Sequence, residues 1–380
     1  MQTKPQNEYQ IMKEDEGIVL FYPNIPKCAI DSVADTLKSR WIGQGPKVDK
    51  FEKEFAEKFT SGLPSLAVGS GTDALHLSYI LAGLKMGDEV ISPVFTCTAT
   101  NTPFLYMGVK IRFADINPQT MNINVNHVKQ LVNEKTKAIV CVHYGGLPAD
   151  MKQLQKIADK WEIPIIEDAA HAIGATYKGK SIGSISDFTM FSFQAIKHIT
   201  TGDGGMLVVK DKNLIEKAKR IRWFGIDRTN KQKGIWENDI FEIGYKYQMT
   251  DIGAAIGLAS LKEFDRTLLH RKTLFHKYEE LLSKIDGIKM IGTGLTDREH
   301  AAWLCTIITD DRIDLMKKLR ENNIESAQVH YRNDRYTVFK ESRGYFPNMD
   351  KIENKYLVLP LHTRITIENI EKICDIISKG

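Results

Sequence analysis

A turn rich in glycine and hydroxyl side chains has the composition of a phosphate-binding loop. It precedes a helical pattern and reads, in order, Gly69, Ser70, Gly71, Thr72 and Asp73. Glycine lets a backbone approach a ligand closely, and the free N–H groups and dipole at a helix start attract phosphate. We therefore expect a phosphate cradle here rather than an ordinary glycine-rich turn.

The same segment also fits the Gly-x-Gly-x-x-Ala spacing of a dinucleotide-binding loop. That fold places an acidic residue about 20 positions further on, at the end of the next strand. Asp88 and Glu89 lie near that distance, but they come before the strand that begins at Val90. The placement does not match, so a nicotinamide-dependent oxidoreductase is only an alternative hypothesis.

A carboxylate follows the apolar run at residues 164–166. Open α/β sheets bind ligands at the carboxyl ends of their strands, and Asp168 is expected at such an end. A partly buried carboxylate needs a cationic partner, or it takes up a proton. A protonated pyridine nitrogen is one such partner. A capping role for Asp168 at a strand–helix turn explains this motif equally well.

One lysine, Lys197, is placed between an apolar strand and a Thr-Thr-Gly-Asp-Gly-Gly turn. Its apolar neighbours in sequence are Phe191, Phe193, Ile196 and Ile199. Desolvation lowers the pKa of a lysine and frees its amine as a nucleophile, although a lysine beside a strand is more often a surface residue. A phosphate cradle, a carboxylate at a strand end and a sheltered lysine together match the requirements of pyridoxal phosphate.

Short apolar runs alternate with helical patterns from residue 68 onward, which predicts an α/β fold with a mostly parallel sheet. Strands are expected at 90–94, 110–114, 138–142, 164–167, 188–193 and 205–209. Helices are expected at 72–84, 126–134, 150–161, 212–222 and, as one long segment, 250–281. A smaller α+β part follows, with a strand at 303–309 and helices at 312–322 and 365–378.

The length of 380 residues suggests two domains, which we place at 1–255 (large, cofactor-binding) and 256–380 (small). A net charge of +4 indicates no nucleic-acid partner. The five cysteines are widely spaced, so we expect neither a disulfide framework nor a metal site. No apolar segment suggests a membrane helix, and residues 1–8 contain no apolar run typical of a secretion signal, so a cytoplasmic location is expected.

Over nearly its whole length, the chain resembles the DegT/DnrJ/EryC1/StrS family of sugar-nucleotide aminotransferases, which are fold-type I pyridoxal-phosphate enzymes. The resemblance rests on several motifs in the family's order: 39–46 with 51–52, Ser-Gly-Thr-Asp-Ala-Leu at 70–75, 87–91, Glu-Asp-Ala-Ala at 167–170, 191–205, 244–250, Val-His-Tyr at 329–331 and Leu-Pro-Leu-His at 359–362.

The resemblance implies roles for particular residues. Lys197 would bind the cofactor and later move protons, and Asp168 would pair with its ring nitrogen. The phosphate would be held by Ser70, Gly71, Thr72 and Ser192. His171 stands where the family commonly has glutamine and would contact the ring or its 3′ oxygen. The family also implies a homodimer whose active sites lie at the subunit interface.

Two positions depart from the family pattern. Cys97 stands where an aromatic side chain commonly stacks on the cofactor, and Phe95 could replace it only in a different strand register. Lys246 stands where an asparagine commonly reaches the phosphate in the neighbouring subunit. A lysine can serve there as a point charge, although Gln248 is an alternative. Relatives that dehydrate the sugar at C3 carry histidine in place of Lys197, so the lysine favours transamination.

The predicted reaction therefore moves the amino group of glutamate, which leaves as 2-oxoglutarate, onto C4 of a nucleotide-linked 4-keto-6-deoxyhexose for amino-sugar biosynthesis. Amination at C3 is the alternative within the family, and a non-catalytic regulator that keeps the cofactor fold is a further one. A diphosphate substrate calls for cationic donors. The candidates are the cluster His330, Tyr331 and Arg332, together with Arg222, Arg228 and Arg335.

Overall fold

The computed structural model describes residues 11–237 and 239–379. The expectation of a cytoplasmic location rests partly on residues 1–8, which lie outside these ranges. Within the described part of the chain, no helix has both the length and the apolar character needed to cross a bilayer.

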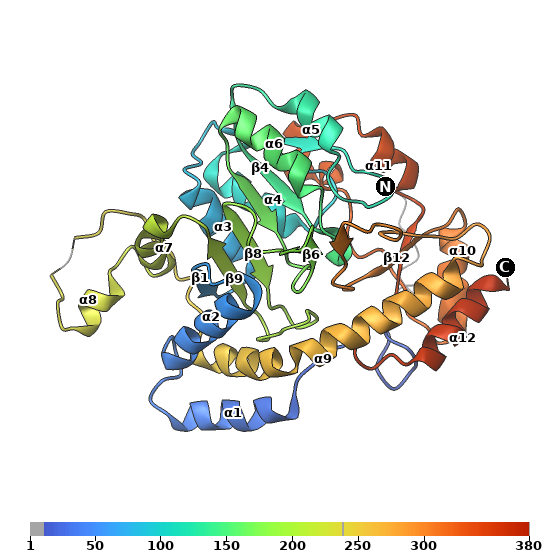
Figure 1. The fold of residues 1–380 in the computed structure, drawn as a ribbon, viewed down its shortest axis with the longest axis horizontal. Coiled ribbons are helices and arrows are strands. Elements are labelled where there is room, and N and C mark those ends of the chain that lie inside the picture. The colour runs from blue at the N-terminus through green and yellow to red at the C-terminus, as the bar shows by residue number, and fades with distance from the viewer. Residues whose placement is uncertain (1–10, 238, 380) are drawn as a thin grey trace.

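A seven-stranded sheet forms the centre of the molecule (Figure 1). Its strands, in spatial order, are β1 (Ser65–Val68), β9 (Gly205–Val209), β8 (Phe188–Ser192), β5 (Ile165–Asp168), β4 (Thr136–Val142), β2 (Glu89–Pro93) and β3 (Lys110–Ala114). Pairing is parallel except on the two sides of β9, which runs antiparallel to both β1 and β8. The six strands predicted for this sheet and its mostly parallel character are confirmed.

Helices accompany this sheet along the chain. They are α1 (Lys27–Lys38), α2 (Pro46–Phe59), α3 (Gly71–Leu81), α4 (Thr98–Met107), α5 (Val125–Leu131), α6 (Met151–Trp161), α7 (Ile215–Arg222) and α8 (Arg228–Gln232). The predictions missed α1, α2, α4, α8 and strand β1. Helix α4 combines threonines with an internal Pro103, which hides its helical character, and β1 is a four-residue buried strand without alternation.

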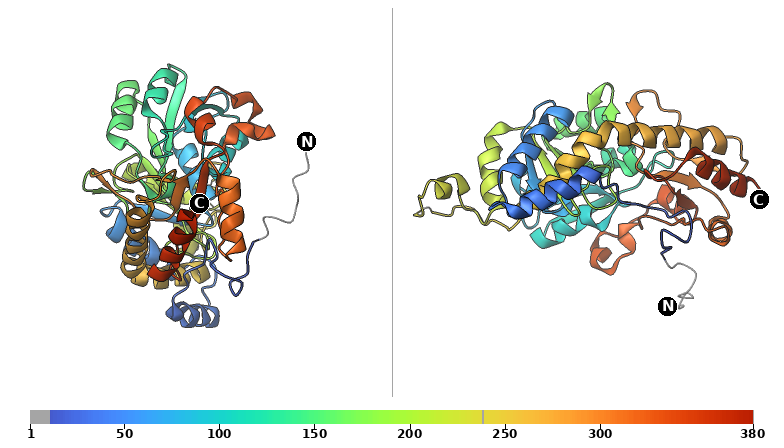
Figure 2. Two further views of the ribbon diagram at one scale, coloured as in Figure 1. Left: turned by 90° about the vertical axis from the view of Figure 1, so that its right-hand side faces the viewer. Right: turned by 90° about the horizontal axis from the view of Figure 1, so that it is seen from below.

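The long helix α9 (Asp251–Leu282) confirms the predicted helical segment and extends from the large sheet to the C-terminal part of the chain (Figures 1 and 2). There β10 (Lys289–Met290), β12 (Cys305–Ile308) and β13 (Tyr356–Leu359) form a small antiparallel sheet with α10 (Arg312–Glu321), α11 (Pro347–Ile352) and α12 (Ile367–Ser378). A third sheet contains β6 (Thr176–Tyr177), β7 (Lys180–Ser181) and β11 (Arg298–Glu299). The domain boundary at 255/256 stays a prediction and falls inside α9.

The buried carboxylate of Asp251, at the start of α9, caps a different helix. Its oxygens accept hydrogen bonds from the backbone N–H groups of Gly45 (2.8 Å), Lys47 (3.1 Å) and Val48 (3.0 Å). These groups lie at the start of α2, whose own N-cap, Gly45, has no side chain to offer. Asp251 therefore ties the loop before α2 to α9.

We predict that Asp251→Ala lowers the free energy of unfolding by about 2–4 kcal/mol, because it leaves buried N–H groups without acceptors. Urea denaturation followed by circular dichroism measures this change. Asp265→Ala is the matched control, because this exposed carboxylate of the same helix pairs with Lys58 at the surface and caps no helix. Equal shifts in the two variants would contradict the capping role.

Candidate active site

A cavity of about 700 Å³ opens at the edge of the large sheet where its parallel strands end. β5 ends there with Asp168, β8 with Ser192, and the turn after β1 brings Gly71 to the same edge. Nine predicted site residues line this one cavity: Ser70, Gly71, Thr72, Cys97, Asp168, His171, Ser192, Lys197 and His330. Segments far apart in the sequence therefore converge where α/β sheets bind ligands.

The predicted phosphate cradle lies at the first turn of α3. Ser70 is the N-cap, and its hydroxyl accepts a hydrogen bond from the N–H of Asp73 (3.0 Å). A Cβ added to Gly71 would lie 3.2 Å from Sδ of Met190 and from Cβ of Ser192. Glycine thus leaves room between the helix start and β8, and the N-terminal N–H groups of α3 with the Ser192 hydroxyl suit an anion.

Asp168 is buried beside the cavity that it lines. Thr100 donates a hydrogen bond to its Oδ2 (2.6 Å), and the N–H of Ala170 donates to its Oδ1 (3.1 Å). Burial raises the pKa of Asp168, and these hydrogen bonds lower it in part. Within residues 11–237 and 239–379, Asp168 forms no ion pair with a basic side chain, so a cationic ligand would stabilise its charge.

The amine of Lys197 lies in the same cavity, against the indole face of Trp303. Its Nζ is 3.5 Å from the centroid of the Trp303 ring. Burial lowers the pKa of Lys197 to about 7, although the charges of Asp168 and Cys97 act in the opposite direction. A large fraction of this amine is therefore neutral near neutral pH and able to act as a nucleophile or base.

Two histidines on the cavity wall are uncharged. The rings of His171 and His330 lie parallel, with centroids 5.4 Å apart, and Nδ1 of His171 accepts a hydrogen bond from the N–H of Gly145 (3.3 Å). Burial first, and the charge of Lys197 second, hold the pKa of His171 well below its usual value and lower that of His330 to about 3. Both can donate or accept hydrogen bonds, but neither supplies positive charge at neutral pH.

Six predicted residues do not line the cavity: Arg222, Arg228, Lys246, Tyr331, Arg332 and Arg335. Arg222 forms an ion pair with Glu52 (2.5 Å), and Arg335 forms one with Glu353 (3.3 Å). The guanidinium of Arg332 is buried in ion pairs with the carboxylates of Asp334 (2.7 Å) and Glu353 (2.9 Å) and with Asp350. These carboxylates already neutralise Arg332, so we no longer propose it as a substrate ligand. Tyr331 lies outside the cavity lining, and Lys246 projects at the surface near the Phe224 ring.

Cys97 faces the cavity as its position predicts, whereas Phe95 does not replace the missing aromatic ring. Phe95 is buried and packs against Tyr144 and Tyr356, with ring centroids 5.3 and 5.1 Å away. The strand register therefore turns Phe95 into the core. The cavity wall at position 97 is a thiol.

Sequence reasoning missed two residues that contact the predicted ones. Thr100 bonds Asp168, and Trp303 contacts Lys197 and stacks on His171, with ring centroids 3.7 Å apart. Thr100 lies in the same short segment as Cys97 and could have been included on that ground. Trp303 carried no usable signal, because it occurs in an apolar run that predicted only a strand.

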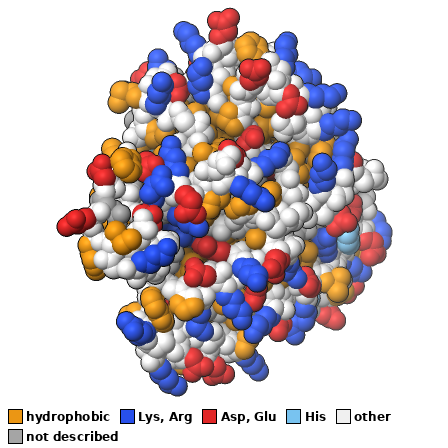
Figure 3. Space-filling model, turned by 60° about the vertical axis from the view of Figure 1, so that its left-hand side comes forward, with side chains coloured by type: hydrophobic (Ala, Val, Ile, Leu, Met, Phe, Trp, Pro, Cys, Tyr) orange, Lys and Arg blue, Asp and Glu red, His pale blue; other side chains and the backbone are white. Residues whose placement is uncertain are grey.

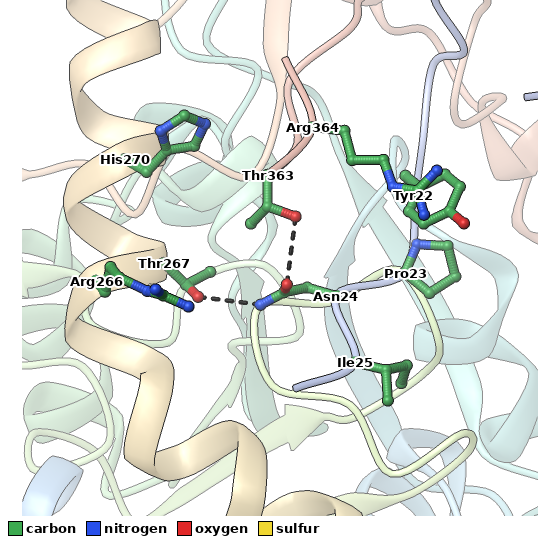
Figure 4. A pocket seen from close by; sticks show the side chains of 9 residues that line it. All are labelled: Tyr22, Pro23, Asn24, Ile25, Arg266, Thr267, His270, Thr363 and Arg364. Carbon is green, nitrogen blue, oxygen red and sulfur yellow. Dashed lines mark hydrogen bonds between the residues drawn. The ribbon is translucent and has the colours of Figure 1, made fainter. Parts of the chain in front are cut away.

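A second cavity, of about 550 Å³, lies where α9 meets the N-terminal and C-terminal segments (Figure 4). Asn24 joins the two sides: it donates to Thr267 (3.0 Å) and accepts from Thr363 (3.4 Å). None of the predicted site residues lines this cavity. The candidate active site is therefore the cavity around Lys197.

Residues 23–378 match the model of the DegT/DnrJ/EryC1/StrS aminotransferase family. The chain belongs to this family and is an aminotransferase of fold-type I, as the sequence predicted. Aminotransferases of this family depend on pyridoxal phosphate, which confirms the predicted cofactor. The nicotinamide-dependent oxidoreductase is not supported.

The relatives in these comparisons include sugar aminotransferases. The chain is 32% identical to GDP-perosamine synthase of Escherichia coli O157:H7, over 95% of this chain and 98% of the relative. It is 30% identical to UDP-4-amino-4-deoxy-L-arabinose–oxoglutarate aminotransferase of Shewanella sediminis, over 96% and 98%. The solved PMP form of the putative sugar aminotransferase Spr1654 from Streptococcus pneumoniae superimposes with a TM-score of 0.89 at 29% identity, over 95% of this chain and 98% of that one.

The residues present fit pyridoxal phosphate. The cradle at Gly71 offers space and anion-binding groups for a phosphate, the buried Asp168 lacks a cation that a protonated pyridine nitrogen would supply, and Lys197 offers an amine. The cofactor-binding residues that we propose are Ser70, Gly71, Thr72, Asp168, His171, Ser192 and Lys197, with Cys97 beside the ring.

We predict that in cofactor-free protein the labelling of Lys197 by an amine-reactive reagent rises through pH about 7. The lysine of an unstructured peptide added to the same sample should reach half of its maximal rate only near the ordinary lysine pKa of about 10.4. Burial destabilises the ammonium form, so the curve for Lys197 shifts to lower pH. Peptide mass spectrometry gives both rates in one sample, and coincident curves would contradict the desolvated environment.

Proposed function

We propose that the protein transfers the amino group of glutamate onto C4 of a nucleotide-linked 4-keto-6-deoxyhexose. The observation that carries this proposal is the Lys197 amine, with its pKa lowered to about 7, in one cavity with Asp168 and the cradle at Gly71. Bound pyridoxal phosphate supplies an electron-withdrawing ring that stabilises negative charge on a carbon next to nitrogen. A cytoplasmic location is part of the same proposal.

The chain's own residues position the reactants and move protons. Lys197 can take up and release a proton at Nζ near neutral pH, which suits a general base that becomes a general acid. Asp168, oriented by Thr100, presents a carboxylate to a cationic ring nitrogen. His330 is a neutral hydrogen-bonding group on the cavity wall, and we propose that it and the exposed Tyr331 that follows it contact the sugar.

The name of one relative favours amination at C4 over amination at C3. The relative from Shewanella sediminis carries a 4-amino-4-deoxy sugar in its name. The lysine at position 197 favours transamination over dehydration at C3, because the family members that dehydrate there carry histidine. The C3 aminotransferase remains the second candidate, because no lining residue distinguishes the two carbons.

The cavity lacks the positive charge that phosphate groups require. Among its lining residues within the described part of the chain, Lys197 is the one lysine or arginine, while Asp168, Asp203 and Glu325 contribute carboxylates. Helix-end N–H groups bind phosphate, but a dianionic group gains further stabilisation from a nearby cation. We therefore propose that a second copy of the chain completes the site with Lys246.

The segment around α8 has the surface properties expected of a region that contacts a second copy of the chain. It projects from the body of the molecule in Figure 1 and in the right-hand view of Figure 2. It exposes Trp236 (71%), Phe241 (79%) and Ile243 (84%), which is typical of a surface that a partner covers. Figure 3, turned toward this side, shows hydrophobic side chains among Lys and Arg side chains. These features support a homodimer with shared active sites.

The substrate is tested by supplying glutamate with UDP-, dTDP- and GDP-linked 4-keto-6-deoxyhexoses and measuring 2-oxoglutarate. We predict turnover with one of them and a product aminated at C4, as identified by NMR. Borohydride treatment of the cofactor-loaded protein should attach the cofactor to the peptide containing Lys197, and Lys197→Ala should lose activity by at least a thousandfold.

Lys160→Ala is the control, because it removes an exposed lysine on α6 and should keep full activity. A product aminated at C3 would select the second candidate. Attachment of the cofactor to another lysine would refute the role of Lys197. Cofactor binding without 2-oxoglutarate formation on any substrate would favour the non-catalytic regulator.

Hybrid dimers test whether Lys246 acts on the partner's site. We predict that Lys197→Ala and Lys246→Glu are each inactive alone, but that mixed and re-equilibrated subunits recover about a quarter of the wild-type activity, since half of the dimers hold one complete site. Subunits that carry both substitutions, mixed with Lys197→Ala, form the control. No recovery in the first mixture would show that Lys246 does not complete a neighbouring site.

A further inference from the structure

Trp303 lies at the centre of a stack of rings on the cavity wall. Its indole lies nearly parallel to the His171 ring, with centroids 3.7 Å apart and planes at 16°. Phe21 stacks on Trp303 at 5.9 Å and 17°. Nζ of Lys197 lies over the Trp303 ring, 3.5 Å from its centroid. Trp303 is almost completely buried, so the indole has little freedom to leave this position.

The backbone that carries Trp303 is held by hydrogen bonds from several elements. The N–H of Trp303 donates to the carbonyl of Gly145 (3.0 Å), and the buried Arg271 of α9 donates to the carbonyl of Trp303 (3.3 Å). The indole Nε1 donates to the carbonyl of Ile196, the residue before Lys197 (3.3 Å). The ring and the lysine are thereby fixed relative to each other.

Ala302, the residue before Trp303, adopts a conformation that L residues rarely take. Its φ is +53°, and His300 Nδ1 accepts a hydrogen bond from its N–H (2.7 Å). Arg271 also donates to its carbonyl (3.2 Å). Such strain persists only where the surroundings enforce it, and it occurs preferentially at functional sites. Here it directs the indole toward Lys197.

We propose that Trp303 is a positioning residue whose indole face holds the charged amine of Lys197 in the cavity whenever this lysine is not bound to the cofactor. The negative face of an aromatic ring attracts an ammonium group, most strongly when water is excluded. The inference rests on the proposed function, because only a lysine that is released and used again during turnover needs such a resting place.

An indole suits this task better than a carboxylate. The charges that act on Lys197 come from Asp168 and Cys97, which favour the ammonium form, and from Arg271, which opposes it. His171, His330 and His198 also face Lys197, and burial keeps them neutral. A ring face stabilises the ammonium without a directional hydrogen bond, so the amine can leave it for the reacting carbon without breaking such a bond.

Fluorinated tryptophans test the electrostatic attraction without changing the shape of the ring much. The chain contains five tryptophans, so the protein is produced with mono-, di- or trifluorotryptophan at all five positions. The pKa of Lys197 is measured in cofactor-free protein from the pH dependence of amine labelling on its peptide. We expect the pKa to fall stepwise with each fluorine, by about one unit in total, as the ring face loses its negative charge.

The control is Trp303→Phe protein produced with the same fluorinated tryptophans, which then occupy the other four tryptophan positions. No stepwise shift is expected in that background, and circular dichroism checks that each protein is folded. A Lys197 pKa independent of fluorine number, or an equal shift in Trp303→Phe, would overturn the proposal. The measurement needs neither cofactor nor sugar, so its failure differs from failure of the proposed function, which the turnover assay reports.

Discussion

The burial of one amine constrains the rest of this structure. An ammonium group loses hydration when it enters the cavity at the end of the large sheet, and the pKa of Lys197 falls to about 7 as a result. The fall in the pKa of Lys197 is limited by the nearby charge of Asp168 and, as we propose, by the indole of Trp303. The balance leaves Lys197 close to half-protonated near neutral pH, which is the condition under which one group can both accept and donate protons.

The sheet brings these groups together through the direction of its strands. β5 and β8 are parallel neighbours, so Asp168 and Ser192 end at the same edge. The antiparallel β9 starts at that edge, after the turn that contains Asp203 and Gly204. The N-terminus of α3 is directed there as well, which adds anion-binding N–H groups to the same cavity. The turn after β1 and the end of β8 would thus hold the phosphate of the cofactor, and the end of β5 would hold its ring.

Charge is distributed unevenly between the cavity and the surface. Among the described residues, the cavity lining holds three carboxylates and a single lysine, whereas basic and exposed apolar side chains gather on the projecting segment around α8. Arg332 contributes no positive charge to the cavity, since its guanidinium is neutralised by ion pairs with Asp334, Asp350 and Glu353. A single chain therefore offers a place for phosphate but little positive charge for it, and this deficit is the physical reason for expecting a second copy at the site.

The sequence by itself determined the α/β class, six strands of the large sheet and the long helix α9, because apolar periodicity is a local signal. Of the nine predicted residues that line the cavity, local patterns indicated the turn at 70–72, Asp168 and Lys197, and the family resemblance supplied the others. Only the tertiary structure decided which side chains meet. Thr100 reaches Asp168 across 68 positions, Asp251 caps α2 across about 200, and Trp303 contacts Lys197 from a segment that predicted only a strand. Arg332 is excluded from the cavity for the same reason: contacts between distant segments depend on packing, and no local pattern encodes them.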